Sequence, residues 1–526
     1  MKGTGAKILI DCLIHEGVDT LFGYPGGCVL DIFDELYQAR DKITQILTCH
    51  EQGAAHAADG YARATGRVGV VLATSGPGAT NLVTGIANAY MDSVPMVAIT
   101  GNVSLSSYGR DSFQEVDITG VTMPITKHNY IVKDVNDLAA TIAEAFYIAK
   151  SGRPGPVLID IPKNVQQEVG TYMLLPPRAI THKDADKTVL PVIARLLNGS
   201  ERPLIYAGGG ILASGAERAL LGFAERLHCP VASSLMGLGC FPATHPQFLG
   251  LIGMHGTATA AAATRECDLL IAVGARFSDR VAGNRNSFAP QAKIVHIDID
   301  NAELNKNVPA AVTLVSDAKN ALEALTPFVE AHDRSAWTAR IEALKAADKK
   351  HSVPIFPHKI LQAIAKANPD ITVATDVGQH QMWAAQAFPY TRSRSLMTSG
   401  GLGTMGFGLG AAIGASLGTH APVALIIGDG GFHMNLAELV TAVKCKLPVA
   451  IFLFNNNTLG MVRQWQKLFY GKRFSSTTLD MPTDYKLLAK AFGADYLTLT
   501  ETDDVESVVA KALRYKTPVL VNCLIR

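Results

Sequence analysis

The stretch "APVALIIGDGGFHMNLAEL" (421–439) places a carboxylate, Asp429, directly after an apolar run. Residues 423–427 are apolar and rich in branched side chains, which is typical of a strand buried on both faces of a parallel sheet. Glycines flank Asp429, and a helical pattern follows over 436–446. A strand, a glycine turn and a helix in this order predict one unit of an α/β fold. Nothing nearby in the sequence neutralises the carboxylate, so its position needs a reason.

The composition is that of an ordinary globular protein. The chain has 526 residues, of which 48% are hydrophobic, and a formal net charge of +1. This balance argues against a disordered chain and against a nucleic-acid binder that relies on a basic surface. No apolar run reaches the roughly 18 residues of a membrane span. We therefore expect neither nucleic acid nor a membrane as a partner.

The amino end and the cysteines favour a cytoplasmic protein. The stretch "MKGTGAKILIDCLIHEG" (1–17) is typical of a helix start rather than of a signal or transit peptide. The eight cysteines are scattered, without a CxxC pair, and most lie in apolar surroundings. Such cysteines are expected to be reduced core thiols rather than disulfides or zinc ligands.

Short apolar strands alternate with amphipathic helices along almost the whole sequence, the pattern of parallel sheets covered by helices. Two polar, proline-containing stretches interrupt this pattern, at 163–190 and 328–357. We therefore predict an α/β protein with three doubly wound parallel-sheet domains. Their expected bounds are 1–170, 185–330 and 355–526.

A polar cluster follows the next predicted strand after Asp429. Residues 448–454 are apolar and end in three asparagines, 455–457. A right-handed crossover brings the carboxyl ends of both strands to one edge of the sheet, where α/β proteins bind ligands. Asp429 and Asn456 can therefore converge, and this pair suits a Mg²⁺ ion shared with a diphosphate. A tight turn with a solvated aspartate stays an alternative, whereas a nicotinamide site fits poorly because its acid lies about 20 residues after the glycines.

A GDG triplet followed by an asparagine pair at this spacing resembles the signature of thiamine-diphosphate enzymes. The resemblance implies that Asp429, Asn456 and the carbonyl of Thr458 bind Mg²⁺. That cofactor also needs a carboxyl group in an apolar site beside its pyrimidine ring. Glu51 in "ITQILTCHEQGAAHAADGYARATG" (43–66) follows a predicted strand and is the candidate. The alternative is a carboxylate that only stabilises a helix start.

Longer motifs resemble the acetohydroxyacid synthase family, also called acetolactate synthase. They are "FGYPGG" (22–27), "GVVLATSGPGATNLVTGIANAYMDSVPMVAITG" (69–101), "FQEVDITG" (113–120), "ITKHN" (125–129), "SGRPGPVLIDIPKNVQ" (151–166), "TDVGQHQMWAAQ" (375–386), "SGGLGTMGFGLGAAIGA" (399–415) and "LGMVRQWQKLF" (459–469). The resemblance implies that the first domain binds the pyrimidine ring and the third the diphosphate. The cofactor contacts that it implies are Gly26, Gly76, Gln379, His380, Gly403, Met405, Gly430, Gly431 and Met461.

The middle of the chain has the pattern of a dinucleotide site. The stretches "RPLIYAGGGILASGAERALLGFAERL" (202–227), "CDLLIAVGARFSDRVAG" (267–283) and "AKIVHIDID" (292–300) are predicted strands that end in glycines or acids. A glycine turn within a packing domain is the alternative. The family resemblance implies FAD, in a structural role. The contacts that it implies are Gly208, Gly209, Ser234, Leu235, Met254, His255, Gly274, Arg276, Arg280, Asp298 and Asp317.

The resemblance also implies a reaction between two 2-keto acids. Glu51 would activate the cofactor, pyruvate would lose CO₂, and the hydroxyethyl carbanion would add to a second pyruvate or to 2-oxobutyrate. The products would be acetolactate and acetohydroxybutyrate, in the first common step of branched-chain amino-acid synthesis. Members of the family that this sequence resembles normally continue beyond the position of "LVNCLIR" (520–526). The added residues form a tail that helps cover the active site.

Five more residues have expected roles toward the substrates. Arg276 suits the carboxylate of the second keto acid because arginine binds such groups bidentately. Trp465 would pack against the extra methyl group of 2-oxobutyrate. Gln114 and Lys127 would support the intermediates, and Phe113 would shape the pocket. Alternatively, Phe113 and Trp465 are aromatic residues of the core, and Lys127 is a surface charge.

Two rival functions and several partners follow from the same features. One rival is another thiamine-diphosphate enzyme acting on 2-keto acids, such as a pyruvate oxidase, a glyoxylate carboligase or a sulfoacetaldehyde acetyltransferase. The other is a catalytically silent regulatory homologue, against which Glu51, Asp429 and Asn456 argue. Glu51 and Asp429 lie on different domains and must meet across one cofactor. In the family that this sequence resembles, they meet between two subunits, so the resemblance implies a homodimer or homotetramer. A small regulatory subunit is a further possible partner.

Overall fold

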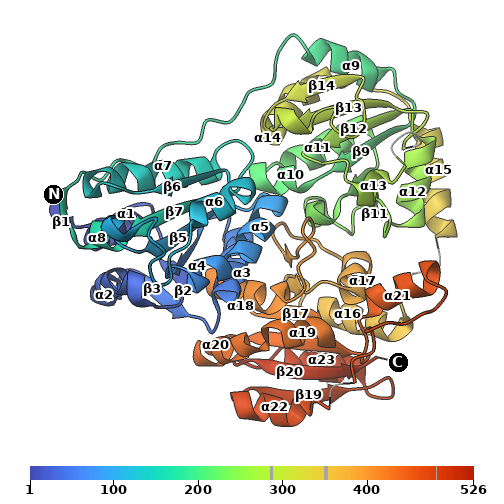
Figure 1. The fold of residues 1–526 in the computed structure, drawn as a ribbon. Helices are drawn as coiled ribbons and strands as arrows, with labels where there is room; N and C mark the ends of the chain where they lie inside the picture. The colour runs from blue at the N-terminus through green and yellow to red at the C-terminus, as the bar shows by residue number, and fades with distance from the viewer. Residues whose placement is uncertain (285–287, 349–352, 481, 526) are drawn as a thin grey trace. The chain divides into compact units, whose positions relative to one another are not determined.

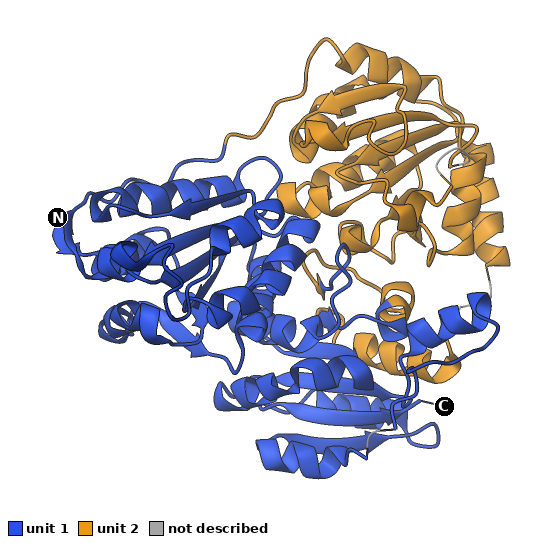
Figure 2. Ribbon diagram, viewed as in Figure 1, with its two compact units in different colours: residues 1–180, 371–381, 397–526 blue, residues 181–370, 382–396 orange. Residues whose placement is uncertain are grey.

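A computed structural model describes residues 1–284, 288–348, 353–480 and 482–525. The chain divides into two compact units: unit 1 contains 1–180, 371–381 and 397–526, and unit 2 contains 181–370 and 382–396 (Figure 2). They contain three six-stranded sheets, which confirms the predicted class of three parallel-sheet α/β domains (Figure 1). Among the described residues, no helix is both long enough and apolar enough to cross a membrane.

The amino-terminal sheet of unit 1 has the order β3-β2-β4-β5-β7-β6, and its strands are parallel. The strands are β2 (Thr20–Gly23), β3 (Thr44–Leu47), β4 (Gly69–Ala73), β5 (Met96–Asn102), β6 (His128–Ile131) and β7 (Pro156–Pro162). The helices are α1 (Gly5–His15), α2 (Leu30–Gln38), α3 (Glu51–Thr65), α4 (Pro77–Asn81), α5 (Val83–Asp92), α6 (Ile118–Thr122), α7 (Leu138–Lys150) and α8 (Lys163–Gln167). A separate antiparallel pair consists of β1 (Lys2–Thr4) and β8 (Val169–Thr171).

Helices cover both faces of this sheet, which explains its continuous apolar strands. In β4, Val70 and Leu72 belong to a core with α1, α2 and α7, whereas Val71 and Ala73 belong to a core with α3 and α5. Successive strand residues point to opposite faces, so a strand covered on both sides has no polar alternation.

The carboxy-terminal sheet of unit 1 has the order β16-β15-β17-β18-β20-β19. Its strands are β15 (Thr372–Thr375), β16 (Leu396–Met397), β17 (Val423–Gly428), β18 (Val449–Asn455), β19 (Asp495–Leu499) and β20 (Val519–Leu524). The helices of this region are α17 (Gln379–Ala387), α18 (Phe407–Thr419), α19 (Asp429–Asn435), α20 (Leu439–Lys444), α21 (Gly460–Phe469), α22 (Tyr485–Phe492) and α23 (Val505–Ala512). The strands expected over 423–427 and 448–454 are both present.

Helices α3 and α18 pack along each other and join the two sheets of unit 1 through one continuous apolar core (Figure 1). A Cβ built on Gly60 would lie 2.2 Å from the carbonyl oxygen of Ala411. One built on Gly414 would lie 1.8 Å from that of Ala57. Only glycine permits this approach, so small residues fix the distance between the two helices.

Unit 2 contains the central sheet, with the order β11-β10-β9-β12-β13-β14 and parallel strands. The strands are β9 (Pro203–Ala207), β10 (Val231–Ser233), β11 (Phe248–Leu251), β12 (Leu269–Val273), β13 (Lys293–Asp298) and β14 (Val312–Val315). The helices are α9 (Leu190–Asn198), α10 (Gly209–Ser214), α11 (Glu217–Leu227), α12 (Ala258–Glu266), α13 (Asp279–Ala282), α14 (Ala318–Leu325), α15 (Ser335–Ala347) and α16 (Ile355–Ala367).

The helical run predicted over 436–446 is confirmed only in part, because α20 covers Leu439–Lys444 alone. Helix α19 begins at Asp429 itself, and a 3₁₀ turn over Leu436–Glu438 separates it from α20. Asn435 leaves the helical conformation with φ of −138°. Its side-chain amide donates to the carbonyl of Gly406 at 3.1 Å, a contact that hydrophobic periodicity cannot reveal.

Candidate active site

Asp429 lies where β17 ends, beside the end of the neighbouring strand β18. The two strands pair in parallel, with Gly428 opposite Phe454. Asp429 is 2% exposed. Its Oδ1 accepts the N–H of Gly430 at 2.9 Å, and its Oδ2 accepts the N–H of Asn457 at 2.6 Å. The structure thus brings together the two polar strand ends.

The surroundings of Asp429 fit a cation. Burial raises the pKa of Asp429, although backbone N–H groups act in the opposite direction. The side-chain oxygen of Asn456 accepts the N–H of Thr458 at 3.0 Å, so an amide oxygen lies in the same turn. In the described parts of the chain, no group of three His, Cys, Asp or Glu side chains is placed to hold a metal ion. A carboxylate, an amide and a carbonyl instead suit Mg²⁺ that takes its other oxygens from phosphates and water.

His380 packs against the start of the same turn. A Cβ built on Gly428 would lie 3.0 Å from His380 Nδ1. The Nε2 atom is buried and has no hydrogen-bond partner among the described residues. Burial lowers the pKa of His380 to about 4, so the ring is neutral near pH 7. A neutral ring with an unsatisfied buried nitrogen fits a phosphate oxygen as its partner.

A pocket of about 560 Å³ adjoins this turn. Its lining residues are Gln379, Thr458, Gly460, Arg463, Gln464, Lys467, Lys472 and Phe474. The Nε2 of Gln379 donates to the Oε1 of Gln464 at 3.0 Å, which ties the start of α17 to α21. Three cationic side chains make this wall positive, which suits an anionic ligand.

Met461 and Trp465 lie on α21, none of whose residues is buried. Trp465 is 39% exposed, and its ring packs edge to face on Phe469 with 6.0 Å between the centroids. This exposure excludes the alternative of a core residue for Trp465.

Met405 reaches the glycine turn from the segment before α18. A Cβ built on Gly430 would lie 3.6 Å from Met405 Cε. Gly403 has φ of +72°, a left-handed conformation that glycine adopts without strain. The carboxylate of Asp376 then accepts the N–H of Gly406 at 3.0 Å. The segment is therefore anchored directly beside the Asp429 turn.

Glu51 is the first residue of α3 and is 8% exposed. Its Oε2 accepts a hydrogen bond from Asn81 Nδ2 at 2.9 Å. A Cβ built on Gly78 would lie 3.2 Å from its Oε1, so the first turn of α4 lies against the carboxylate. This buried setting is the one that proton exchange with a heterocyclic ring requires.

A second buried carboxylate, Glu438, holds the turn in front of Glu51. Its Oε1 accepts the N–H groups of Cys49 and His50 at 3.0 Å each. Burial raises the pKa of Glu438. The break between α19 and α20 thus brings a carboxylate of the carboxy-terminal region to the start of α3.

Gly76 and Gln114 lie against each other close to Glu51. Gly76 has φ of +55°, and a Cβ built on it would lie 2.8 Å from the carbonyl oxygen of Gln114. Phe113 is 86% exposed, so it is not a core residue. A Cβ built on Gly26 would lie 2.5 Å from the side chain of Thr74, the residue that follows β4.

Lys127 contacts the carboxyl end of α7. Its ammonium donates to the carbonyls of Ile148 and Ser151, the latter at 2.6 Å. A cation at this end of a helix interacts favourably with the helix dipole. Its expected role toward the intermediates stays a prediction.

Glycines meet at the carboxyl edge of the sheet in unit 2. A Cβ built on Gly208 would lie 2.1 Å from the carbonyl oxygen of Gly274, which itself has φ of +56°. Gly209 starts α10, and Ser234 accepts a hydrogen bond that caps the 3₁₀ turn beginning at Leu235. Bare backbone at a strand edge fits a pyrophosphate.

Two acids flank this edge. Asp298, the last residue of β13, is 8% exposed, and its Oδ1 accepts the N–H of Asp300 at 2.9 Å. It has the strand-end position of an acid that binds a ribose. Asp317 instead caps α14 by accepting the N–H groups of Lys319 and Asn320 at 2.9 and 3.2 Å.

Of the remaining expected contacts of unit 2, Arg280 lies on α13, and Met254, His255 and Arg276 lie in loops. Met254 donates its N–H to the carbonyl of Arg280 at 2.8 Å, and the Arg280 guanidinium lies 3.8 Å from the Met254 sulfur. Burial and the charge of Arg280 lower the pKa of His255. The carbonyl of Arg276 accepts the Tyr206 hydroxyl at 3.1 Å, which fixes the backbone at this arginine.

Comparison with known proteins assigns these groups to a family. Residues 3–121 match the thiamine pyrophosphate enzyme N-terminal TPP binding domain, 190–325 its central domain and 376–523 its C-terminal TPP binding domain. The probable acetolactate synthase large subunit of Methanocaldococcus jannaschii is 46% identical over 99% of this chain and 92% of its own length. The chain belongs to the acetolactate synthase large-subunit family.

Two bacterial members of the acetolactate synthase family are also similar to this chain over nearly its whole length. The acetolactate synthase isozyme 2 large subunit of Escherichia coli K12 is 45% identical over 98% of this chain and 95% of its own length. The acetolactate synthase large subunit of Haemophilus influenzae is 42% identical over 98% of this chain and 93% of its own length. The groups around Glu51 and Asp429 fall within the two TPP binding domains of this family.

Asp376 is a buried carboxylate beside the site that the sequence motifs did not single out, although its position carries a signal. Like Asp429, it follows a buried strand directly, since β15 ends at Thr375. Asp376 is fully buried, and burial raises its pKa to about 6. A Cβ built on Gly431 would lie 2.2 Å from its Oδ1, so Asp376 supports the glycine turn from behind. No local pattern indicates that Glu438 binds the backbone of Cys49 and His50, because these residues lie nearly 390 positions away.

Proposed function

We propose that this chain is the catalytic subunit of an acetolactate synthase that uses thiamine diphosphate, Mg²⁺ and FAD. It would decarboxylate pyruvate and transfer the two-carbon unit to a second 2-keto acid. Pyruvate would give acetolactate, and 2-oxobutyrate would give acetohydroxybutyrate. The observation that supports this most strongly is the nearly full-length family match of a chain with both buried groups, around Glu51 and Asp429, intact. When bound, thiamine diphosphate supplies the electron sink for decarboxylation.

Glu51 is assigned to proton transfer at the pyrimidine ring. Its burial and its hydrogen bond from Asn81 support this role, because both fix the carboxyl group in a site from which water is largely excluded. Asp429, Asn456 and the Thr458 carbonyl are assigned to Mg²⁺. With these roles, the domains at 1–170 and 355–526 bind the pyrimidine ring and the diphosphate.

The domain at 185–330 is assigned to FAD. The close contact of Gly208 and Gly274 and the strand-end carboxylate of Asp298 support this ligand. Arg276 is assigned to the carboxylate of the second keto acid. Trp465 is assigned to its alkyl group, where one methylene is typically worth about 1–3 kcal/mol.

Partners and location belong to the same proposal. The relatives are named large subunits, which supports a small regulatory subunit for this chain. A homodimer or homotetramer that shares one cofactor between copies is part of the proposal. It rests on the family resemblance and on the position of Glu51 and Asp429 in the two TPP binding domains. The eight cysteines are free thiols, which supports the cytoplasm.

Product analysis tests the function. Purified protein is incubated with pyruvate, Mg²⁺, thiamine diphosphate and FAD, with and without 2-oxobutyrate. We expect acetolactate, which gives way to acetohydroxybutyrate when 2-oxobutyrate is present. Acetate formed with consumption of oxygen would instead indicate a pyruvate oxidase. Bound cofactor without any loss of pyruvate would indicate other acceptors or a silent homologue, and acetaldehyde alone would show that the ligation step is missing.

A further inference from the structure

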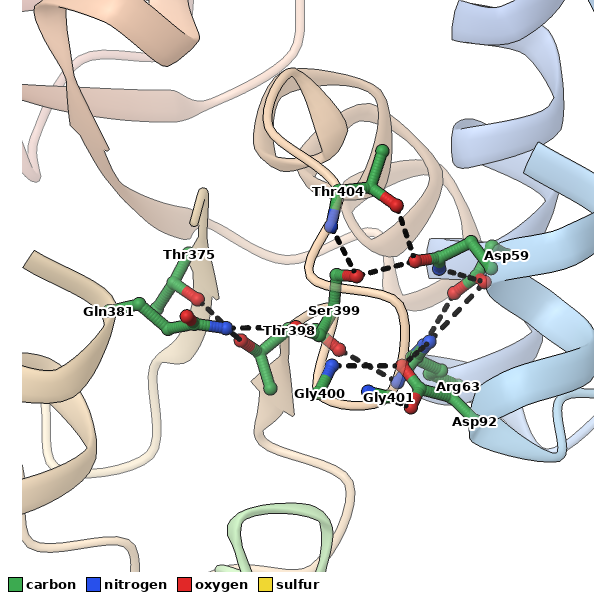
Figure 3. Close-up of polar contacts among 11 residues, drawn as sticks. Asp59, Arg63, Asp92, Thr375, Gln381, Thr398, Ser399, Gly400, Gly401 and Thr404 are labelled. Carbon is green, nitrogen blue, oxygen red and sulfur yellow. Dashed lines mark hydrogen bonds and ion pairs between the residues drawn. The ribbon is translucent and has the colours of Figure 1, made fainter. Parts of the chain in front are cut away.

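A buried ion-pair network joins α3 and α5 to the segment that precedes α18 (Figure 3). On α3, Arg63 donates to both carboxylate oxygens of Asp59. The same guanidinium donates to Asp92 Oδ2, at the end of α5, at 2.9 Å. The side chains of Asp59 and Asp92 are fully buried, and that of Arg63 is 8% exposed. Two carboxylates share one guanidinium, and the carboxylate oxygens of Asp92 also accept hydrogen bonds from further donors.

Those donors belong to the backbone of the segment before α18. Asp92 accepts the N–H of Gly400 at 3.0 Å and that of Gly401 at 2.7 Å. Arg63 Nη1 donates to the carbonyl of Thr398 at 2.9 Å (Figure 3). Gly400 and Gly401 are exposed and have no side chains that could pack. Hydrogen bonds to the network therefore determine where this backbone lies.

Asn88 on α5 makes a second set of contacts to the same segment. Its Oδ1 accepts Ser399 Oγ at 2.5 Å and Thr404 Oγ1 at 3.1 Å. Its Nδ2 donates to Asp59 Oδ2 at 3.0 Å. Ser399 Oγ also accepts the N–H of Thr404 at 2.9 Å, which closes the segment into a loop (Figure 3). We call Asp59, Arg63, Asn88 and Asp92 the latch.

The held segment leads directly to the candidate cofactor site. Met405 follows Thr404, and its Cε lies 3.6 Å from the position of a Cβ on Gly430. Gly430 is also the donor to Asp429. Two helices of the amino-terminal region thus fix one wall of a site in the carboxy-terminal region.

We propose that Asp92 and Asn88 are positioning residues for thiamine diphosphate, because they hold residues 399–405 in one conformation before the cofactor binds. A site that is already ordered binds its ligand more tightly, since the ligand need not order the loop. The inference rests on the proposed function, which supplies the cofactor. It extends that function to residues that do not touch the ligand.

Three variants test this role in the full-length protein freed of cofactor. Asp92→Asn removes the charge that holds Gly400 and Gly401 but leaves Arg63 paired with Asp59. Ser399→Ala removes the contact to Asn88 from the segment side. The control is Tyr61→Phe, which deletes a 2.8 Å hydrogen bond from α3 to Asp19 away from the segment. Calorimetric titration gives the Kd of thiamine diphosphate with Mg²⁺, thermal unfolding gives Tm, and near-ultraviolet circular dichroism reports the bound cofactor.

We expect Asp92→Asn and Ser399→Ala to raise this Kd by about tenfold, the factor for one lost hydrogen bond to a charged or polar partner. At saturating cofactor, kcat should recover, so that the KM for thiamine diphosphate changes and kcat does not. The control should lower Tm but leave the Kd within about twofold. An unchanged Kd in both Asp92→Asn and Ser399→Ala, whatever their Tm, would overturn the inference. If the unsubstituted protein itself bound no thiamine diphosphate, the proposed function would fail and the inference with it.

Discussion

Buried carboxylates recur at or near the carboxyl ends of strands in unit 1. Asp376 follows β15, and Asp429 follows β17. Asp160 lies within β7, two residues before the strand ends. Burial raises the pKa of all three. Their hydrogen-bond donors differ: backbone N–H groups for Asp376 and Asp429, but the side chains of β5 for Asp160. Asp429 binds the turn after β18, which also contains the side-chain oxygen of Asn456. The neighbours of each carboxylate therefore decide which of them can hold a cation.

The raised pKa of Asp160 predicts that the stability of the folded protein depends on pH. It accepts Thr100 Oγ1 at 2.7 Å and Asn102 Nδ2 at 2.6 Å, and burial raises its pKa to about 7. The folded protein therefore binds more protons than the unfolded chain between pH ~4 and ~7, and the contribution of Asp160 to stability falls as pH rises through this window. For Asp160→Asn, the Tm relative to the unsubstituted protein should rise from pH ~5 to ~8. Thermal unfolding at both pH values checks this, and parallel pH profiles would contradict it.

Glu51 can be separated from cofactor binding. In Glu51→Gln, the side-chain oxygen can still accept from Asn81, but the group no longer exchanges a proton. We expect acetolactate formation to fall about 10²–10⁴-fold, the usual contribution of a general acid or base. The Kd of thiamine diphosphate should change little, because the shape of the site is kept. Loss of binding together with turnover would instead mean that Glu51 is needed to form the site.

At the scale of elements, the crossing of α3 and α18 controls how the two sheets of unit 1 are joined. Gly414→Ala adds a methyl group where a Cβ would lie 1.8 Å from the Ala57 carbonyl oxygen. Overpacking of this kind typically costs about 1–3 kcal/mol. We expect a lower Tm and a higher Kd for thiamine diphosphate.

The matched control for this substitution is Gly222→Ala on α11. A Cβ on Gly222 meets open space. An alanine in a helix is favoured over glycine by roughly 0.5–1 kcal/mol, so this control should keep or raise Tm. Equal losses of Tm in both variants would show that the close approach of α3 and α18 is not the cause.

The strands were predictable from sequence where local chemistry decides them. The apolar runs at 423–427 and 448–454 form β17 and β18. A strand with helices on both faces is recognisable from its continuous apolar run alone. The convergence of Asp429 with the asparagine turn was predictable because one crossover separates them. The break at Leu436–Glu438 was not, since Asn435 and Glu438 bond to residues elsewhere in the chain. The latch was missed for the same reason: Asp92 and Gly401 are 309 positions apart.

At the scale of the whole molecule, the two proposed cofactor sites belong to different compact units. The groups around Glu51 and Asp429 are in unit 1, and the glycines at Gly208 and Gly274 are in unit 2. A ligand that binds only the folded state stabilises the part that contains its site. The two cofactors should therefore protect different stretches of one chain.

Hydrogen exchange measured by mass spectrometry tests whether each cofactor protects a different unit. At a concentration of 100 times its Kd, each ligand adds about 2.7 kcal/mol to the stability of its binding state. Thiamine diphosphate with Mg²⁺ should slow exchange in β17 and β18, whereas FAD should slow it in β9 and β12. Asp429→Asn should abolish the first effect and keep the second, and Asp298→Asn should do the reverse. Protection of both units by either ligand alone would contradict separate sites, because stabilisation would then pass from one unit to the other.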